Sequence, residues 1–164
     1  MIRLAKQEDI ESVVEIYNQA IDAKFQTAFT EKLDKVEKLE WFSQFRDSQY
    51  PMFVYTESEK VVGWFSVTPY RQGRGALRYT VEISYYIHAH HQRKGIGQKL
   101  LQHALDACRQ LNYKTAIAII LDKNIPSIRL MEKFGFEKWG HLPFVADFDG
   151  VECGHVYYGL RLNK

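Results

Sequence analysis

Near the middle of the sequence, a long strand leads through a glycine-containing loop into a helix, and few folds contain this arrangement. Residues 77–87 (LRYTVEISYYI) are rich in β-branched and aromatic residues, which favours a long strand. The loop HQRKGIG (91–97) follows shortly after it. Gly97–Leu111 then places apolar residues on one helical face, namely Leu100, Leu101, Ala104, Leu105 and Cys108. This order indicates an α/β domain.

The residues before this unit predict a strand, two helices and a hairpin. Ile2–Ala5 favours a short strand, and 52–56 with 61–67 favour a hairpin, followed by a loop at 68–76. Glu8–Ile21 favours a helix, because one apolar stripe is formed by Ile10, Val13, Val14 and Tyr17. A second helix is expected over Val36–Phe45, with these side chains facing inward: Val36, Leu39, Phe42 and Phe45.

The residues after the unit predict one more strand, one helix and a β-rich end. TAIAIIL (115–121) is apolar on both faces and favours a buried strand. Pro126 suits a first helical turn, and Gly135 suits the end of that helix. Residues 136–163 are β-rich, with a turn at Asp149-Gly150. The expected order is β-α-α-β-β-β-α-β-α-β-β, in one domain over residues 1–164 with a mixed sheet.

Composition argues against several classes of function. A net charge of +2 on 164 residues is too small to argue for nucleic acid or an anionic membrane as the main partner. A membrane span needs about 20 consecutive apolar residues, which the sequence lacks. Acids from position 8 onward argue against a signal peptide. Cys108 and Cys153 form no motif and are expected to be small buried side chains in a cytoplasmic protein.

The loop after the long strand is predicted to bind a phosphate or pyrophosphate. The first N–H groups of a helix lack partners and point toward an incoming anion. Gly95 and Gly97 allow close backbone approach, while Arg93 and Lys94 add positive charge. The sequence has no GxxxxGK[ST] and no early GxGxxG, so neither a P-loop nor a dinucleotide fold fits. An ordinary glycine turn is the alternative.

Three histidines precede this loop and raise the question of a metal site. His88, His90 and His91 lie within four positions. Zinc sites use three or four ligands at recognised spacings, and no nearby cysteine or acid completes such a set. We therefore expect loop histidines and no metal.

The pattern Gln92-Arg93-Lys94-Gly95-Ile96-Gly97 resembles the coenzyme A pyrophosphate loop of the GCN5-related N-acetyltransferases (GNAT). The segments IYNQAI, TAFTE, TVEISYYIHAHHQRKGIG and DKNIPSIRLMEKFGF extend the resemblance to the phosphinothricin and methionine sulfoximine/sulfone N-acetyltransferase branch. The resemblance implies the GNAT fold, a mostly antiparallel twisted sheet flanked by helices. It also implies acetyl-CoA as donor, a small primary amine as acceptor, and a homodimer.

The resemblance assigns donor-binding roles to two parts of the chain. The backbone of the strand would run along the pantetheine arm, and one N–H would polarise the thioester carbonyl. Asn124 and Ser127 would contact the arm, although Asn124 is equally suited to cap a helix. The full set of expected donor-binding residues is Tyr85, Tyr86, Ile87, Arg93, Lys94, Gly95, Ile96, Gly97, Gln98, Asn124 and Ser127.

Glu82 matches the acid of the family's TVE segment. An ammonium group must lose a proton before it attacks a thioester, so a carboxylate there is expected to act as general base. The alternative is a strand residue facing solvent. By the same resemblance the acceptor site would include Glu82 with Phe29, Gln72, Gly73, Arg74, Ile83 and Ser84. Core packing for Phe29 and a solvated Arg74 are the alternatives.

The sequence departs from the family at two places. Met131 stands where many members have a tyrosine that reprotonates the CoA thiolate, and methionine cannot donate a proton. The C-terminal segment carries acids at 147, 149 and 152, with His155 near the usual Asp. These acids favour either a cationic acceptor or an exposed hairpin tip. Acetylation of a protein amine or aminoglycoside, or a CoA-binding module without catalysis, are the alternative functions.

Overall fold

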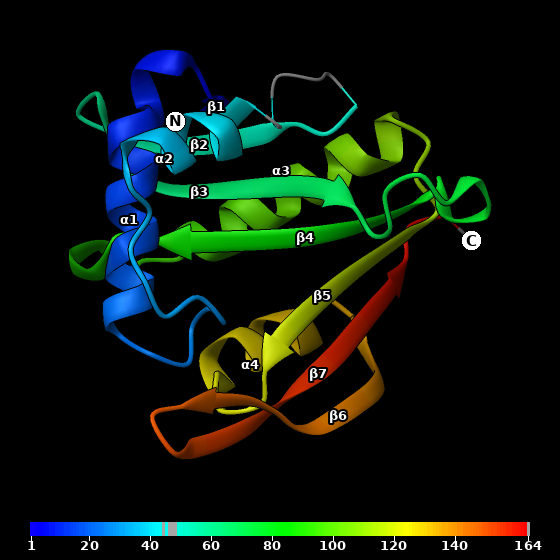
Figure 1. The fold of residues 1–164 in the computed structure, drawn as a ribbon. Helices are drawn as coiled ribbons and strands as arrows, with labels where there is room; N and C mark the ends of the chain where they lie inside the picture. Colours follow the sequence, from blue (N-terminus) through cyan, green and yellow to red (C-terminus); the bar gives the residue numbers. More distant parts are fainter. Residues whose placement is uncertain (44, 46–48, 164) are drawn as a thin grey trace.

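One mixed sheet of seven strands forms the centre of the protein (Figure 1). The computed structural model describes residues 1–43, 45 and 49–163. The strand order is β1-β2-β3-β4-β5-β7-β6, and only β4 and β5 are parallel. The strands are β1 (Ile2–Leu4), β2 (Met52–Glu57), β3 (Lys60–Pro69), β4 (Thr80–Ile87), β5 (Thr115–Leu121), β6 (Glu137–Phe148) and β7 (Val151–Arg161).

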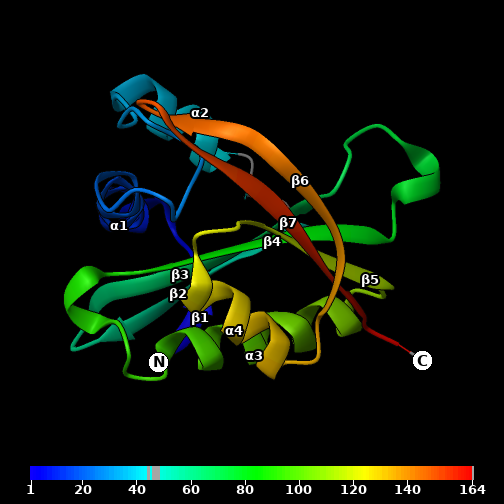
Figure 2. The same ribbon diagram turned by 90° about the horizontal axis from the view of Figure 1, so that it is seen from below.

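Helices cover both faces of this sheet (Figure 2). One face carries α1 (Ile10–Asp22) and α2 (Lys35–Ser43). The opposite face carries α3 (Ile96–Gln110) and α4 (Ile125–Lys133). The predicted order of strands and helices is confirmed. Across the described residues, none of the helices is long and apolar enough to cross a membrane.

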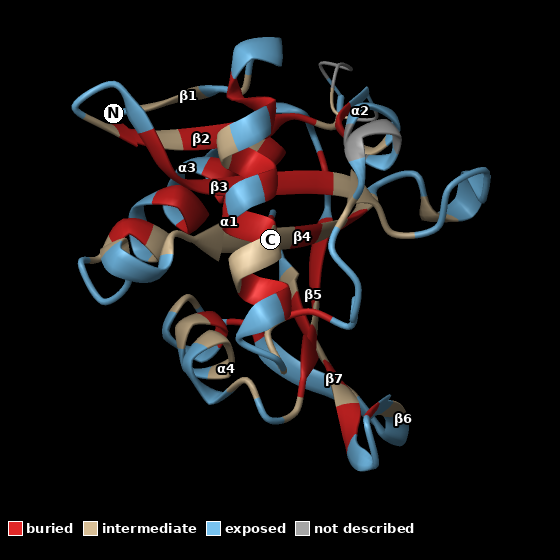
Figure 3. Ribbon diagram, turned by 60° about the vertical axis from the view of Figure 1, so that its left-hand side comes forward, coloured by how far each residue is buried: buried red, intermediate tan, exposed pale blue. Residues whose placement is uncertain are grey.

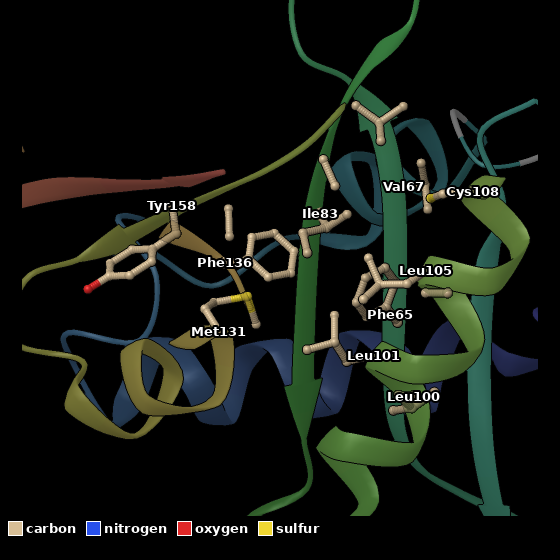
Figure 4. Packing of buried hydrophobic residues seen from close by; sticks show 14 of the residues in the cluster. Phe65, Val67, Ile83, Leu100, Leu101, Leu105, Cys108, Met131, Phe136 and Tyr158 are labelled. Carbon is tan, nitrogen blue, oxygen red and sulfur yellow. The ribbon is translucent and has the colours of Figure 1, made fainter. Parts of the chain in front are cut away.

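The larger apolar core lies between the sheet and the α3/α4 side (Figure 4). The apolar stripe of α3 packs on Phe65, Val67 and Ile83 of β3 and β4. Met131 of α4 and Phe136 continue the same cluster toward Tyr158 of β7. A single core therefore joins the strands β2–β4 to the strands β5 and β7. Cys108 is buried in this core, and Cys153 is buried near the end of the sheet.

The smaller core lies under α1, whose predicted stripe is buried (Figure 3). Ile10, Val13, Val14 and Tyr17 contact strands β2 and β3. The indole N–H of the buried Trp64 donates to the Val13 carbonyl at 3.0 Å, which fixes α1 on the sheet.

Several predicted boundaries and one orientation are wrong. The α1 helix starts at Ile10 because Gln7–Asp9 form a 3₁₀ turn, and β3 extends to Pro69. The long strand begins at Thr80, since 75–77 also form a 3₁₀ turn. Leu39 is 49% exposed rather than inward, because α2 is short and only part of its surface meets the core. Phe42 is buried as predicted, and the side chain of Val36 lies outside the described part.

Candidate functional site

The site is a cleft where the parallel strands β4 and β5 separate. Pairing between them covers only Thr80–Glu82 against Thr115–Ile117, and beyond these residues the strands diverge (Figure 1). A cleft of about 350 Å³ lies there, bounded by β4, β5, the start of α3 and α4. The sheet thus offers a gap with strand backbone on both sides.

The backbone of β4 turns hydrogen-bonding groups into this gap. The His88 N–H donates to the Val62 carbonyl of β3 at 2.9 Å. Because bonding alternates along an antiparallel pair, the N–H groups of Tyr85 and Ile87 point away from β3. In agreement, the Ile87 carbonyl accepts from Gln92 Nε2 at 3.4 Å rather than from β3. Beyond Glu82, β5 does not pair with these groups.

The α3 helix begins at one end of the cleft and presents free N–H groups. Gly95 precedes its first residue with φ +78°, and an added Cβ there would meet no atom within 4 Å. The bond from Lys99 N–H to the Gly95 carbonyl at 3.2 Å is the first of the helix. The preceding N–H groups of Ile96, Gly97 and Gln98 therefore have no intrahelical acceptor. Together with the positive helix end, they suit an anion.

Hydroxyl and amide groups of β4 and α4 line the middle of the cleft. The Tyr85 hydroxyl donates to Ser127 Oγ at 2.9 Å, and burial raises the pKa of Tyr85. Asn124 caps α4, since its side-chain oxygen accepts the Ser127 N–H at 3.4 Å. The helix-cap alternative for Asn124 is therefore observed, while Asn124 also lines the cleft. Met131 lies buried among the same lining residues.

Glu82 lies beside the point where the strands separate. Its neighbours across the sheet are Thr68 of β3 and Ile117 of β5. Val81 and Ile83 point into the α3 core, so Glu82 points to the opposite face, and it is half-buried. Burial raises the pKa of the Glu82 carboxyl, and the positive charge of Arg71 partly opposes this rise. Glu82 is thus a stronger base than a solvated glutamate.

Most of the predicted donor-binding residues come together in this cleft, and most of the predicted acceptor residues do not. Lys94 and Glu82 are not among the residues that line the cleft. Phe29 is 55% exposed beside the Tyr17 ring, with the ring centres 5.8 Å apart. Gln72, Gly73 and Arg74 are exposed in the β3–β4 connection, so their substrate roles stay predictions. The lining includes Ile83, Ser84, Tyr85, Tyr86, Ile87, Arg93, Gly95, Ile96, Gly97, Gln98, Asn124 and Ser127.

Sequence reasoning missed part of the lining. Gln26 of the α1–α2 connection, residues 118–120 of β5 and Leu130 of α4 also face the cleft. The β5 residues carry no chemical signal, because an apolar strand looks the same whether or not its edge is paired. Only the expected parallel pairing with β4 could have suggested them.

Two of the three loop histidines lie beside different glutamates. His91 Nδ1 lies 3.0 Å from Glu57, and His88 Nε2 lies 3.9 Å from Glu15. Burial lowers the pKa of His88. Among the residues described, no group of three or more His, Cys, Asp or Glu side chains could hold a metal ion.

Comparison with known proteins identifies relatives of this chain. Residues 11–136 match the acetyltransferase (GNAT) family. The chain is 39% identical over 163 residues to YwnH of Bacillus subtilis, provisionally named a phosphinothricin acetyltransferase, and the match covers 99% of each. It is 35% identical to the L-methionine sulfoximine/L-methionine sulfone acetyltransferase of Salmonella typhimurium, over 99% of this chain and 95% of that protein.

A solved structure of an acetyltransferase has the same fold over the whole chain. The fold superposes with a TM-score of 0.94 on yncA of Salmonella typhimurium, provisionally described as an acetyltransferase and solved with its cofactor acetyl-CoA. The two chains are 32% identical, and the match covers 100% of this chain and 94% of the other.

Proposed function

Because the chain belongs to the GNAT family of acetyltransferases, we propose that it transfers the acetyl group of acetyl-CoA to the primary amine of a small molecule. The acceptor class is an amino acid or amino-acid analogue of the phosphinothricin or methionine sulfoximine type, as the names of the relatives indicate. The observation that carries this proposal is the cleft between β4 and β5, with free N–H groups at one end and Glu82 beside it.

The donor fits the hydrogen-bonding groups of the cleft. Acetyl-CoA would supply the acetyl group as a thioester. The N–H groups of Ile96, Gly97 and Gln98 would bind its pyrophosphate, helped by the charge of Arg93. The N–H groups of Tyr85 and Ile87 would bind the arm as a neighbouring strand would, and one of them would polarise the carbonyl.

Glu82 would remove the proton from the acceptor amine. Its raised pKa makes it a better base, and its position next to Ile83 and Ser84 puts it near the cleft. Direct transfer then needs no covalent enzyme intermediate. Met131 cannot protonate the leaving thiolate. Burial raises the pKa of Tyr85 and Tyr86, so either hydroxyl stays protonated as a donor, with solvent as the alternative.

The test is release of CoA thiol with saturating acetyl-CoA and four acceptors: phosphinothricin, L-methionine sulfone, an aminoglycoside and a peptide. We expect turnover with the first two. Glu82→Gln should lower kcat by roughly 10²–10⁴-fold. Glu59→Gln, in the exposed β2–β3 turn, is the matched control and should leave kcat unchanged.

Other outcomes identify the alternative functions. Turnover of only the peptide or only the aminoglycoside would show that the acceptor is a protein amine or an aminoglycoside, not an amino acid. Tight CoA binding without turnover of any amine would support a CoA-binding module. Unchanged activity of Glu82→Gln at every pH would show that another group is the base.

We also propose a cytoplasmic homodimer. Both cysteines are free, which suits a reducing compartment. The edge strand β6 exposes Leu142, Phe144 and Val145, an apolar set that a second copy could cover. Light scattering after gel filtration should give twice the mass of 19.3 kDa, and a monomer at micromolar concentration would refute the dimer.

A further inference from the structure

On the face of the sheet that carries Glu82, the indole ring of Trp139 lies directly on Gly159. A Cβ atom added at Gly159 would overlap this ring, so the ring occupies the space of the absent side chain. Trp139 stands at a bulge of β6, between Lys138, which pairs with Tyr158, and Gly140, which pairs with Tyr157. One side of the Trp139 ring packs on Gly159, while the residue stays 49% exposed.

The ring lies on the same face as Glu82, as the alternation of β7 shows. Tyr158 points to the α4 side, where its hydroxyl donates to Glu132 at 2.8 Å. Its neighbour Gly159 therefore faces the other side, the side of Glu82. The N-terminal halves of β4 and β5 and the C-terminal half of the antiparallel β7 thus present one row across this face.

This row has a defined length and chemistry. Glu82 pairs with Ile117, and Ile117 pairs with Gly159. Two strand spacings put Gly159 roughly 10 Å from Glu82. The row has a carboxylate at one end, a largely covered apolar residue in the middle and an aromatic ring at the far end. An acceptor whose amine lies at Glu82 has room to extend its side chain across this row toward the ring.

We propose that Trp139 determines acceptor specificity, by favouring amino acids with a long, uncharged, apolar side chain such as that of methionine or phenylalanine. The inference rests on the proposed function and adds to it. A methionine or phenylalanine side chain spans most of the row, whereas alanine falls short. The ring face is electron-rich, so it favours sulfur or aromatic groups over the anionic phosphinate of phosphinothricin.

The test compares kcat/KM for L-methionine, phosphinothricin and L-alanine, at saturating acetyl-CoA. Trp139→Ala should lower kcat/KM for methionine roughly tenfold or more. It should change the value for the other two acceptors, and the KM for acetyl-CoA, by less than about threefold. Trp139→Phe should restore most of the preference.

Two glycine variants test the packing of the Trp139 ring on Gly159 without replacing Trp139 itself. Gly159→Ala displaces the ring and should reproduce the effect of Trp139→Ala. Gly140→Ala is the matched control, because a Cβ there would lie 4.0 Å from Tyr157 Cβ in ordinary contact. Thermal melting of each variant shows that it is folded.

Two results would overturn the role of Trp139. One is an equal loss for all three acceptors in Trp139→Ala, which would mark a role in folding or subunit contact. The other is Gly159→Ala behaving like Gly140→Ala. An unaltered enzyme that binds acetyl-CoA but acetylates none of the three would instead refute the proposed function, and this inference with it.

Discussion

Replacing Gly95 by alanine should separate the cost of backbone strain from the loss of an anion site. Gly95 has φ +78°, and Gly150 in the β6–β7 turn has φ +88°. An added Cβ meets no atom within 4 Å at either position, so both variants carry only the conformational cost. For a non-glycine residue this is roughly 1–2 kcal/mol. For a chain of this size it lowers Tm by roughly 2–8 °C.

Only Gly95→Ala should weaken CoA binding. Relaxation of its φ would turn the first N–H groups of α3, and loss of one hydrogen bond to a charged group costs roughly 1.5–3 kcal/mol. The Kd for CoA should therefore rise by roughly 10–150-fold, measured by titration calorimetry, while Gly150→Ala keeps the Kd of the unaltered protein. Equal stability losses with equal Kd values would refute the assignment of this loop to the pyrophosphate.

Three further variants test individual contacts. Arg71→Gln removes the positive charge that lowers the Glu82 pKa, so the acidic limb of the pH profile of kcat/KM should move to higher pH. An acidic limb at the same pH in both proteins would contradict an electrostatic interaction between Arg71 and Glu82. Asn124→Asp keeps the α4 cap but replaces the amide, so Tm should stay unchanged while the KM for acetyl-CoA rises. Asn124→Ala removes the cap as well, so it should also lower the free energy of unfolding by about 1 kcal/mol. Burial opposes ionisation of Asp9, but hydrogen bonds from Arg3 and the Lys6 N–H outweigh it and lower its pKa. Asp9→Asn should thus lose roughly 1–3 kcal/mol at pH 7. That deficit should shrink as the pH falls below about 4, since the unaltered protein then loses the same stabilisation; a deficit independent of pH in urea denaturation would contradict the ion pair.

That most of the expected donor-binding residues line one cleft was predictable from the sequence, because the main signal is local. Gly95 and the residues after it are contiguous, and a strand, a loop and a helix start are visible in one stretch of letters. The order of strands and helices was predictable for the same reason. Boundaries failed where short 3₁₀ turns replaced regular structure, as at 75–77, since such turns lack a periodic signal.

The row that we propose for the acceptor was less predictable, because it depends on the pairing of strands that are far apart in the sequence. Ile117 and Gly159 form one row with Glu82 only through the pairing of three strands, and nothing in their local sequence marks them. Trp139 resembles any exposed aromatic residue until Gly159 is seen beneath it. The prediction that Leu39 faces inward was wrong, because a nine-residue helix with a weak apolar stripe can pack on the core with any of several faces.

The early divergence of β4 and β5 has a thermodynamic consequence. Most of the edge between two central strands lacks its hydrogen bonds, because β4 and β5 pair only over Thr80–Glu82. Beyond these residues the shared core beneath α3 and α4 and the Tyr85–Ser127 hydrogen bond connect the two parts of the sheet. With acetyl-CoA bound as proposed, the ligand acts as a substitute strand that only the folded chain can hold. By mass action, a ligand at 100 times its Kd adds about 2.7 kcal/mol to the free energy of unfolding. The amount of folded protein would then follow the supply of its own donor.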